Sequence, residues 1–152
     1  KRIHLAIEAV SQLNDVSLLI CGDGPDVQYF NDLCTQKLGA QRFNIVKVDF
    51  ADIPNVYRSV DAFTLPSEDE PFGRVYLEAM ASGLPVIATD DSMRRTLIGK
   101  AGVVCNVENI GEYAAAIATT LTTDWAGAPI EQAADFSWES VAERYADVIE
   151  SL

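Results

Sequence analysis

Positive charge is scarce in this sequence. Its 152 residues carry 11 lysine and arginine side chains against 23 aspartate and glutamate side chains, a formal net charge of −12. The lysines stand at positions 1, 37, 47 and 100 alone. A broad basic face of the kind that binds nucleic acid is therefore excluded. Any phosphate group that this protein holds must be met by local geometry rather than by a long-range positive field.

Long apolar runs and paired cysteines are lacking as well. No window of about 18 apolar residues is present, and the chain opens with Lys1-Arg2-Ile3-His4, so neither a membrane span nor a signal peptide is predicted. Cys21, Cys34 and Cys105 are odd in number and show no metal-binding or redox spacing. This pattern predicts reduced, buried thiols and a cytoplasmic location.

Aliphatic residues, by contrast, are abundant. Hydrophobic residues make up 49% of the chain, enough for the core of a single domain over residues 1–152. Apolar runs that end near glycine or proline alternate with stretches of helical periodicity, which predicts repeated αβ units. The predicted strands are 16–21, 43–48, 62–65, 86–88 and 103–105. The predicted helices are 3–13, 27–38, 110–121 and a terminal helix, 138–152, capped by Ser137.

Strands joined by helical crossovers predict an α/β fold, a doubly wound, Rossmann-like parallel sheet. In such a sheet the ligand crevice lies outside the carboxyl ends of the strands. Function is therefore expected in the loops that follow strands, here 22–25, 66–73 and 89–92. Trp125 and Trp138 are predicted to anchor the core or a contact between helices.

The segment from Glu70 to Gly83 carries the most chemistry. It joins a strand end to a helix predicted to begin near Gly73, and the free N–H groups at a helix start suit an anion such as phosphate. Glu78 lies about 7 to 8 Å further along the helix axis. Carboxylates accept two hydrogen bonds from neighbouring hydroxyls, so Glu70 and Glu78 around a phosphate site predict a nucleotide sugar as ligand.

The spacing of these acidic residues, taken alone, favours a simpler interpretation in which they have no ligand. Acidic residues ahead of a helix, here Glu68, Asp69 and Glu70, commonly complement the helix dipole, and Glu78 fits a solvated helix face. The turn Gly22-Asp23-Gly24-Pro25 is likewise typical of a tight strand-to-helix connection with proline at the first helical position.

Several short motifs follow one another along the chain. They occupy residues 22–25, 53–57, 61–63, 65–67, 70–88 and 136–139. In this order they resemble the donor-binding domain of the group 1 glycosyltransferases, family 4 of the retaining enzymes that use nucleotide sugars, which have the GT-B fold. Glu70 and Glu78 are similar to the family's two glutamates separated by seven residues. The resemblance covers nearly the whole chain and favours a functional role for both carboxylates.

The resemblance implies roles for residues that match the family's motifs. It implies that Glu70 contacts the transferred sugar and that Glu78 binds the ribose. The backbone around Phe72 and Gly73 is implied to meet the sugar and the diphosphate. Arg74, Gly22 and Gly24 are assigned to donor binding by the same match. No metal ion and no other cofactor is expected.

The first residues of the chain match the family in part. Lys1 falls where the family has a lysine that neutralises the diphosphate leaving group. Arg2 stands where a glycine normally follows that lysine. The resemblance therefore makes Lys1 and Glu70 the candidate catalytic residues.

The sequence also departs from the family. A central strand and a loop bearing an arginine precede the position of Lys1 in the family, so strands 16–21 and 62–65 are expected to face a gap of about 4.8 Å per strand spacing. Unpaired inner edges are costly, so either these strands pair directly or another segment fills the slot. Asp49 replaces a glycine near the nucleotide base, and 90–95 replaces a glycine-rich turn, so Arg94 and Arg95 are not assigned to a phosphate.

These observations predict the C-terminal, nucleotide-sugar-binding half of a retaining, hexosyltransferase-type enzyme of carbohydrate biosynthesis. The acceptor is expected on a preceding domain that this chain lacks and that allows peripheral membrane association. The chain alone is expected to transfer little or no sugar. Two alternatives stay open: a nucleotide-sugar epimerase of the same architecture, and a noncatalytic nucleotide-binding module.

Overall fold

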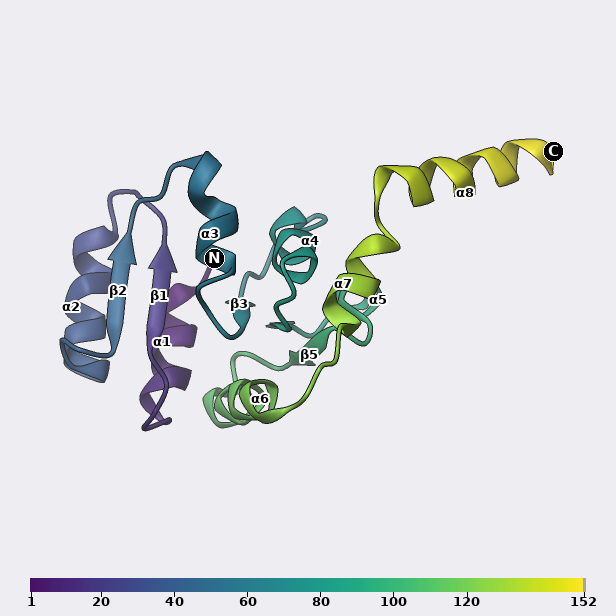
Figure 1. Ribbon diagram of the computed structural model, residues 1–152. Coiled ribbons are helices and arrows are strands. Elements are labelled where there is room, and N and C mark those ends of the chain that lie inside the picture. The colour runs from purple at the N-terminus through teal and green to yellow at the C-terminus, as the bar shows by residue number, and fades with distance from the viewer. Residues whose placement is uncertain (152) are drawn as a thin grey trace.

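Five short parallel strands alternate with helices in the computed structural model, which describes residues 1–151 (Figure 1). The strands are β1 (Leu18–Cys21), β2 (Phe43–Val46), β3 (Phe63–Leu65), β4 (Val86–Thr89) and β5 (Gly102–Cys105). Each lies within or across a predicted strand. The alternating apolar runs therefore locate all of them correctly.

The helices cover every stretch with predicted helical periodicity. They are α1 (Ile3–Ser11), α2 (Val27–Leu38), α3 (Ile53–Tyr57), α4 (Arg74–Ala81), α5 (Ser92–Ile98), α6 (Ile110–Thr122), α7 (Ala128–Ala134) and α8 (Trp138–Glu150). The Ser137 hydroxyl caps α8 as predicted, accepting a hydrogen bond from the Ser140 N–H at 3.1 Å. Leu152, the last residue of the predicted terminal helix, lies outside the described residues.

Strand β4 shows that helices cover both faces of the sheet. The side chain of Ile87 belongs to a core formed with α1, α2 and α6. Its neighbours Val86 and Ala88 belong to a second core with α4 and α5. Alternate residues of a strand point to opposite faces, so both faces are packed by helices. The predicted doubly wound α/β fold is confirmed.

The sheet is divided into two parts. Strand β1 pairs with β2, and β3, β4 and β5 form a separate sheet in that order. Within residues 1–151, β1 and β3 neither pair with each other nor share a strand between them. The expectation that direct pairing or another segment closes the gap is therefore wrong. Helix α1 packs against α2, α6 and β3 at once, so the helical layer bridges the two sheets.

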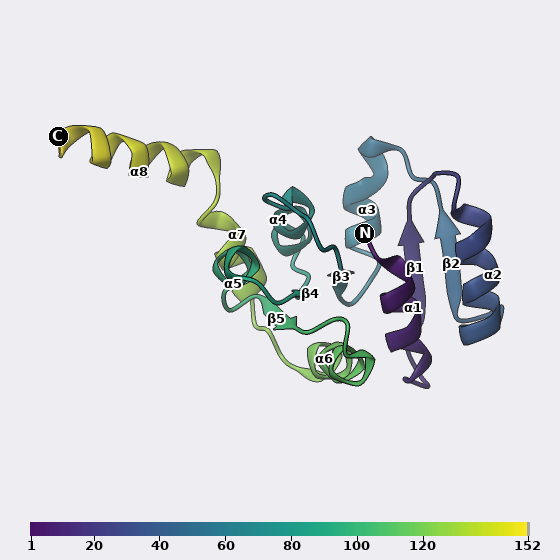
Figure 2. The ribbon, with the colours of Figure 1, turned by 180° about the vertical axis from the view of Figure 1, so that it is seen from behind.

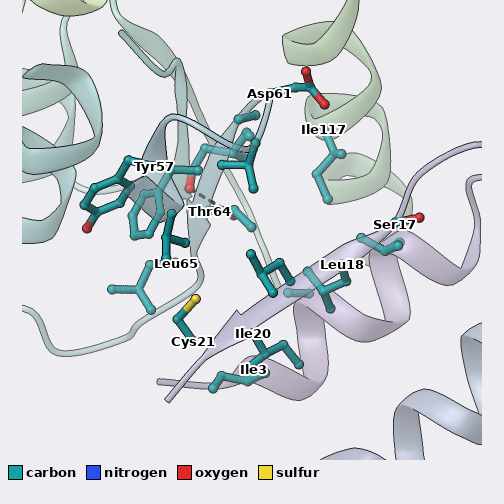
Figure 3. A pocket seen from close by; sticks show the side chains of 18 of the residues that line it. Ile3, Ser17, Leu18, Ile20, Cys21, Tyr57, Asp61, Thr64, Leu65 and Ile117 are labelled. Atoms are coloured by element: carbon teal, nitrogen blue, oxygen red, sulfur yellow. Dashed lines mark hydrogen bonds between the residues drawn. The ribbon is translucent and has the colours of Figure 1, made fainter. Parts of the chain in front are cut away.

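The space between β1 and β3, which we call the slot, holds a cavity of about 1160 Å³ (Figure 3). Leu18 and Ile20 of β1 line one wall, Leu65 of β3 lines the other, and Ile117 of α6 closes one side. The cavity extends from the amino ends of the strands, at Ser17 and Asp61, to their carboxyl ends. Its body is apolar and has the unpaired edges of two sheets as walls.

Helix α8 projects away from the body of the molecule, as both views show (Figures 1 and 2). None of its described side chains is buried, and Trp138 is 86% exposed. The prediction that Trp138 anchors the core or a contact between helices is therefore wrong, because the helix that carries it projects away from the sheet. Trp125 is half-buried and donates from Nε1 to the Thr120 carbonyl at 2.9 Å. No helix within residues 1–151 has the length and apolar character needed to cross a membrane.

The three thiols differ in exposure. Cys34 and Cys105 are buried, as predicted, and burial raises the pKa of Cys105 to about 11. Cys21 is exposed, so the prediction of a buried thiol is wrong there. Cys21 is the last residue of β1; it pairs with Val46 of β2 on one side and lines the cavity on the other.

This difference predicts selective labelling. At pH 8, an alkylating reagent is expected to modify Cys21 faster than Cys105 in the folded protein, because burial raises the pKa of both thiols but Cys105 alone of the two is also covered from the reagent. Mass spectrometry of digested samples, taken with and without denaturant, measures the modification of each cysteine. The Cys21→Ser variant is expected to lose the rapid phase; rapid modification of Cys105 in the native protein would contradict the prediction.

Candidate functional site

The order of the strands fixes where a ligand crevice is expected. From β1 the chain runs to β2 on one side of the slot. It then crosses the slot to β3 and continues to β4 and β5 on the other side, so the strand order reverses at the slot (Figure 1). Ligands of open α/β sheets bind at such a switch point, outside the carboxyl ends of the strands. There the cavity wall becomes polar, with Lys1, Glu70, Arg74 and Glu78. We call these four residues the mouth of the cavity.

The loop from Pro66 to Gly73 leads from β3 into α4. Gly73 is the N-cap of α4 with φ 76°, and a Cβ atom there would lie 2.4 Å from the Tyr76 ring. Glycine is therefore required both for the left-handed backbone and for space. The helix begins at Arg74, as predicted, and no side chain of the described residues caps it. The Tyr76 N–H donates to the Gly73 carbonyl at 2.9 Å, so the N–H groups of Arg74 and Val75 are the ones available to an anion.

Glu70 and Lys1 lie together at the mouth. The Lys1 ammonium group donates to Glu70 Oε2 and forms an ion pair with it. The Lys1 side chain stays about half exposed, whereas most of the Glu70 side chain is covered. The first turn of α4 carries no acidic residue, and Glu70 lies just ahead of it, with its Cγ 3.2 Å from where a Cβ atom of the N-cap Gly73 would be.

Glu78 projects from α4 toward the same cavity. Its side chain is exposed, and its Oε2 accepts a hydrogen bond from the Tyr57 hydroxyl at 3.3 Å. Burial, together with the nearby Glu78 carboxylate, raises the pKa of Tyr57, which keeps this hydroxyl protonated as a donor. Tyr57 ends the 53–57 motif, but the sequence assigns it no role at the site, because its partner is 21 positions away on another helix.

Arg2 anchors the loops that surround the mouth. Its guanidinium donates to the Pro66 carbonyl at 2.8 Å, to Glu108 at 2.9 Å and to the Thr89 hydroxyl at 3.2 Å. These contacts join the ends of β3 and β4 to the loop after β5. Arg2 also has φ 53°, a conformation that costs a residue with a side chain about 1–2 kcal/mol. The resemblance places a glycine at this position, and the backbone conformation gives the physical reason.

The side chains or backbones of three other predicted donor-binding residues lie outside the cavity lining. The Phe72 ring packs edge-to-face on Phe136 at 6.4 Å, whereas the role predicted for Phe72 belongs to its backbone, which directly precedes the N-cap Gly73. Gly22 lines a separate hollow of about 210 Å³, where Lys47 pairs with Asp23 at 2.6 Å. Gly24, with φ 152°, lines neither hollow. The structure therefore places Lys1, Glu70, Arg74 and Glu78 along the lining of one cavity, with Gly73 at the start of the helix that carries Arg74 and Glu78; the Phe72 ring, Gly22 and Gly24 lie outside that lining.

Metal ligands do not gather at this site. Within the part of the chain that the structure describes, no three histidine, cysteine, aspartate or glutamate side chains are placed to hold an ion. The charged groups at the mouth are two carboxylates and two cations, Glu70, Glu78, Lys1 and Arg74. Carboxylates accept hydrogen bonds from hydroxyl groups, and cations beside an uncapped helix start attract phosphate, so the arrangement is chemically suited to a ligand that carries both.

Parallel strands, helices on both faces and a polar site at the switch point define a Rossmann-like α/β domain. A family model described as glycosyl transferases group 1 matches residues 1–137. The chain therefore belongs to the group 1 glycosyltransferases.

Relatives and solved structures agree with this family. The glycogen synthase of Mycobacterium tuberculosis (strain ATCC 25618 / H37Rv) is 32% identical over 162 residues, which covers 97% of this chain and 39% of the enzyme. The D-inositol 3-phosphate glycosyltransferase of Corynebacterium urealyticum is 26% identical, and the match covers 40% of that enzyme. The chain thus spans about two fifths of the length of these relatives.

Two solved structures show the same fold at similar identity. Sucrose-phosphate synthase from Thermosynechococcus elongatus superposes with a TM-score of 0.79 at 26% identity, covering 98% of this chain and 41% of that protein. Anabaena HepE, solved in complex with UDP and glucose, superposes with a TM-score of 0.78 at 26% identity, covering all of this chain and 45% of that protein. The GT-B architecture expected from the sequence is confirmed for this domain.

Proposed function

We propose that this chain is the donor-binding part of a retaining glycosyltransferase that moves a sugar from a nucleoside diphosphate sugar to an acceptor. The observation that carries the proposal is the mouth of the cavity. Two carboxylates, Glu70 and Glu78, flank the uncapped start of α4 at the switch point of the sheet. The complex of the structurally similar HepE with UDP and glucose supports a ligand of this class.

Each group at the mouth has a task in this proposal. The first N–H groups of α4 and the Arg74 side chain meet the diphosphate, whose negative charge grows as the glycosidic bond loosens. Glu78 accepts hydrogen bonds from the ribose hydroxyls, with Tyr57 holding its carboxylate. Glu70 positions the sugar, and Lys1 moves from Glu70 toward the leaving diphosphate when the donor is bound. Charge stabilisation, rather than proton transfer, supplies most of the catalysis.

The acceptor, in this proposal, binds to another domain of a longer protein. Two surfaces of the chain support it: the unpaired edges of β1 and β3 along the slot, and an apolar stripe on α8. The exposed apolar side chains of α8 are Trp138, Tyr145, Val148 and Ile149. Unpaired strand edges and contiguous exposed apolar side chains both favour contact with more polypeptide. The 152 residues alone are therefore expected to transfer little sugar.

Calorimetric titration tests the proposed ligand. We expect the chain to bind at least one of UDP, GDP and ADP, and the corresponding sugar-bearing donor, with equal affinity in the presence and absence of EDTA. EDTA is included because no metal requirement is expected. If none of these nucleotides and donors binds, the proposed function fails for this chain and a noncatalytic module of the same fold is favoured.

An activity assay separates transfer from epimerisation. The longer protein of this proposal is incubated with the donor that binds, with and without candidate acceptors. A transferase consumes the sugar donor in step with formation of the glycosylated acceptor, and a retaining one gives a new bond with the anomeric configuration of the donor. Conversion of the donor into an epimeric nucleotide sugar without an acceptor would identify an epimerase instead.

A further inference from the structure

Arg94 is a buried cation for which the proposed function has no use. It lies in the first turn of α5, and its side chain is 2% exposed. Arginine is rarely buried to this extent without specific partners, because removing its charge from water is costly. Its contacts therefore indicate what the charge is for.

The Arg94 guanidinium reaches three different groups. Nη1 pairs with the Asp91 carboxylate, which also caps α5 by accepting from the Arg94 N–H at 2.8 Å. Nε donates to the Tyr76 hydroxyl at 3.3 Å. Nη2 donates to the Glu68 carbonyl at 3.5 Å. The last two partners belong to the loop and helix that carry Glu70 and Glu78.

Tyr76 extends this network to both ends of the loop from Pro66 to Gly73. Its hydroxyl donates to the carbonyl of Leu65, the last residue of β3, at 3.0 Å. Its ring is fully buried and lies so close to Gly73 that a Cβ atom there would be 2.4 Å from it. Tyr76 therefore contacts the start and the end of the loop.

Arg94 and Tyr76 together hold the loop at three points. The points are Leu65 before it, Glu68 within it and Gly73 at its end, and Glu70 lies between the second and the third. Without the guanidinium, the Glu68 carbonyl loses this partner and the Tyr76 hydroxyl loses a donor. The loop then keeps fewer interactions to oppose its conformational entropy.

We propose that Arg94 is a positioning residue that fixes the 66–73 loop, so that the Glu70 carboxylate is held at the mouth where it meets the sugar of the donor. This inference rests on the proposed function and assigns Arg94 no contact with the donor. Arg94 acts on Glu70 through the backbone of the loop. Glu78 lies further along α4, whose own backbone hydrogen bonds hold it, so we expect Arg94 to affect Glu78 less than Glu70.

The Arg94→Met variant tests the inference by comparing two ligands on the full chain. Affinity for the sugar-bearing donor is expected to fall about tenfold or more, whereas affinity for the nucleoside diphosphate alone changes less than about threefold. The ratio of the two dissociation constants is the readout, because general destabilisation would weaken both ligands together. In a Glu70→Gln background, the Arg94 substitution is expected to leave this ratio unchanged, since the two residues act as one unit.

Hydrogen exchange gives a second readout that needs no ligand. Amides of residues 66–73 are expected to exchange about 5- to 30-fold faster in Arg94→Met, while amides of α6 keep their native protection. Arg95→Met is the matched control, because Arg95 lies on the surface and pairs with Asp90 through Nη2 at 2.6 Å. That variant is expected to behave as the native chain in both measurements.

Each outcome bears on the inference separately from the proposed function. A folded Arg94→Met variant with native loop exchange overturns the positioning role, as does one in which both ligands weaken equally. If no donor binds to the native chain, the proposed function fails, and the exchange measurement still decides whether Arg94 holds the loop. Should Arg94→Met not fold, Tyr76→Phe takes its place, because it removes the bridging hydroxyl and keeps the ring beneath Gly73; it is expected to shift both readouts in the same direction.

Discussion

Replacing Glu78 by alanine is expected to weaken binding of the nucleoside diphosphate by about 10- to 100-fold. Hydrogen bonds to a charged group contribute about 1.5–3 kcal/mol, and each 1.4 kcal/mol corresponds to a factor of ten in the dissociation constant. Because the Glu78 side chain is exposed, its removal is expected to change the free energy of unfolding by about 0.5 kcal/mol or less. Calorimetric titration and a thermal melt of the same sample separate the two effects.

Two further variants define what the Glu78 result means. Tyr57→Phe removes the hydroxyl that donates to Glu78 and is expected to cause a smaller loss, because the carboxylate itself remains. Glu143→Ala changes another exposed glutamate, on α8, and is expected to have no effect on affinity. Nucleotide binding by Glu78→Ala with native affinity would remove the ribose role from Glu78.

Replacing Gly102 by alanine is expected to destabilise the protein by about 3 kcal/mol or more. A Cβ atom at this position would lie 1.9 Å from the Val86 carbonyl oxygen and 2.7 Å from the Val86 nitrogen. Val86 is paired with Gly102 across the two strands, so the clash is relieved only if the backbones of β4 and β5 separate. A loss of this size lowers the melting temperature by about 6–12 °C for a domain of this length. Differential scanning calorimetry measures it.

Gly22→Ala is the matched control for Gly102→Ala. A Cβ atom at Gly22 would have no other atom within 4 Å, and Gly22 has no positive φ, so the same added methyl group is expected to be tolerated. A Gly102→Ala melting temperature as high as that of Gly22→Ala would show that β4 and β5 do not approach each other so closely.

Much of the fold could be predicted from local sequence patterns. Short apolar runs ending near glycine or proline located every strand, because strands buried on both faces must be apolar at nearly every position. The start of α4 near Gly73 was predictable for a similar local reason, since the turn before it needs a residue with positive φ. The short helices α3, α5 and α7 were not predicted, because five to seven residues are too few to establish a helical period.

Exposure was predicted less well than secondary structure. Trp138 and Cys21 are large or apolar enough to suit a core, yet both are exposed. A side chain is buried only if another element packs on it, and that depends on where the chain goes next. Helix α8 leaves the body, and the edge of β1 beside Cys21 faces the slot.

The sequence by itself determined the α/β class, the order of the elements and the pair of acidic residues around one helix start, because each depends on residues within about ten positions of one another. The tertiary structure alone decided that Lys1 pairs with Glu70, that Tyr57 donates to Glu78 and that a buried Arg94 braces the loop between them. It also decided that the sheet divides at the slot. These contacts join segments far apart in the chain, and they form only when the packing of helices on the two sheets brings those segments to one edge.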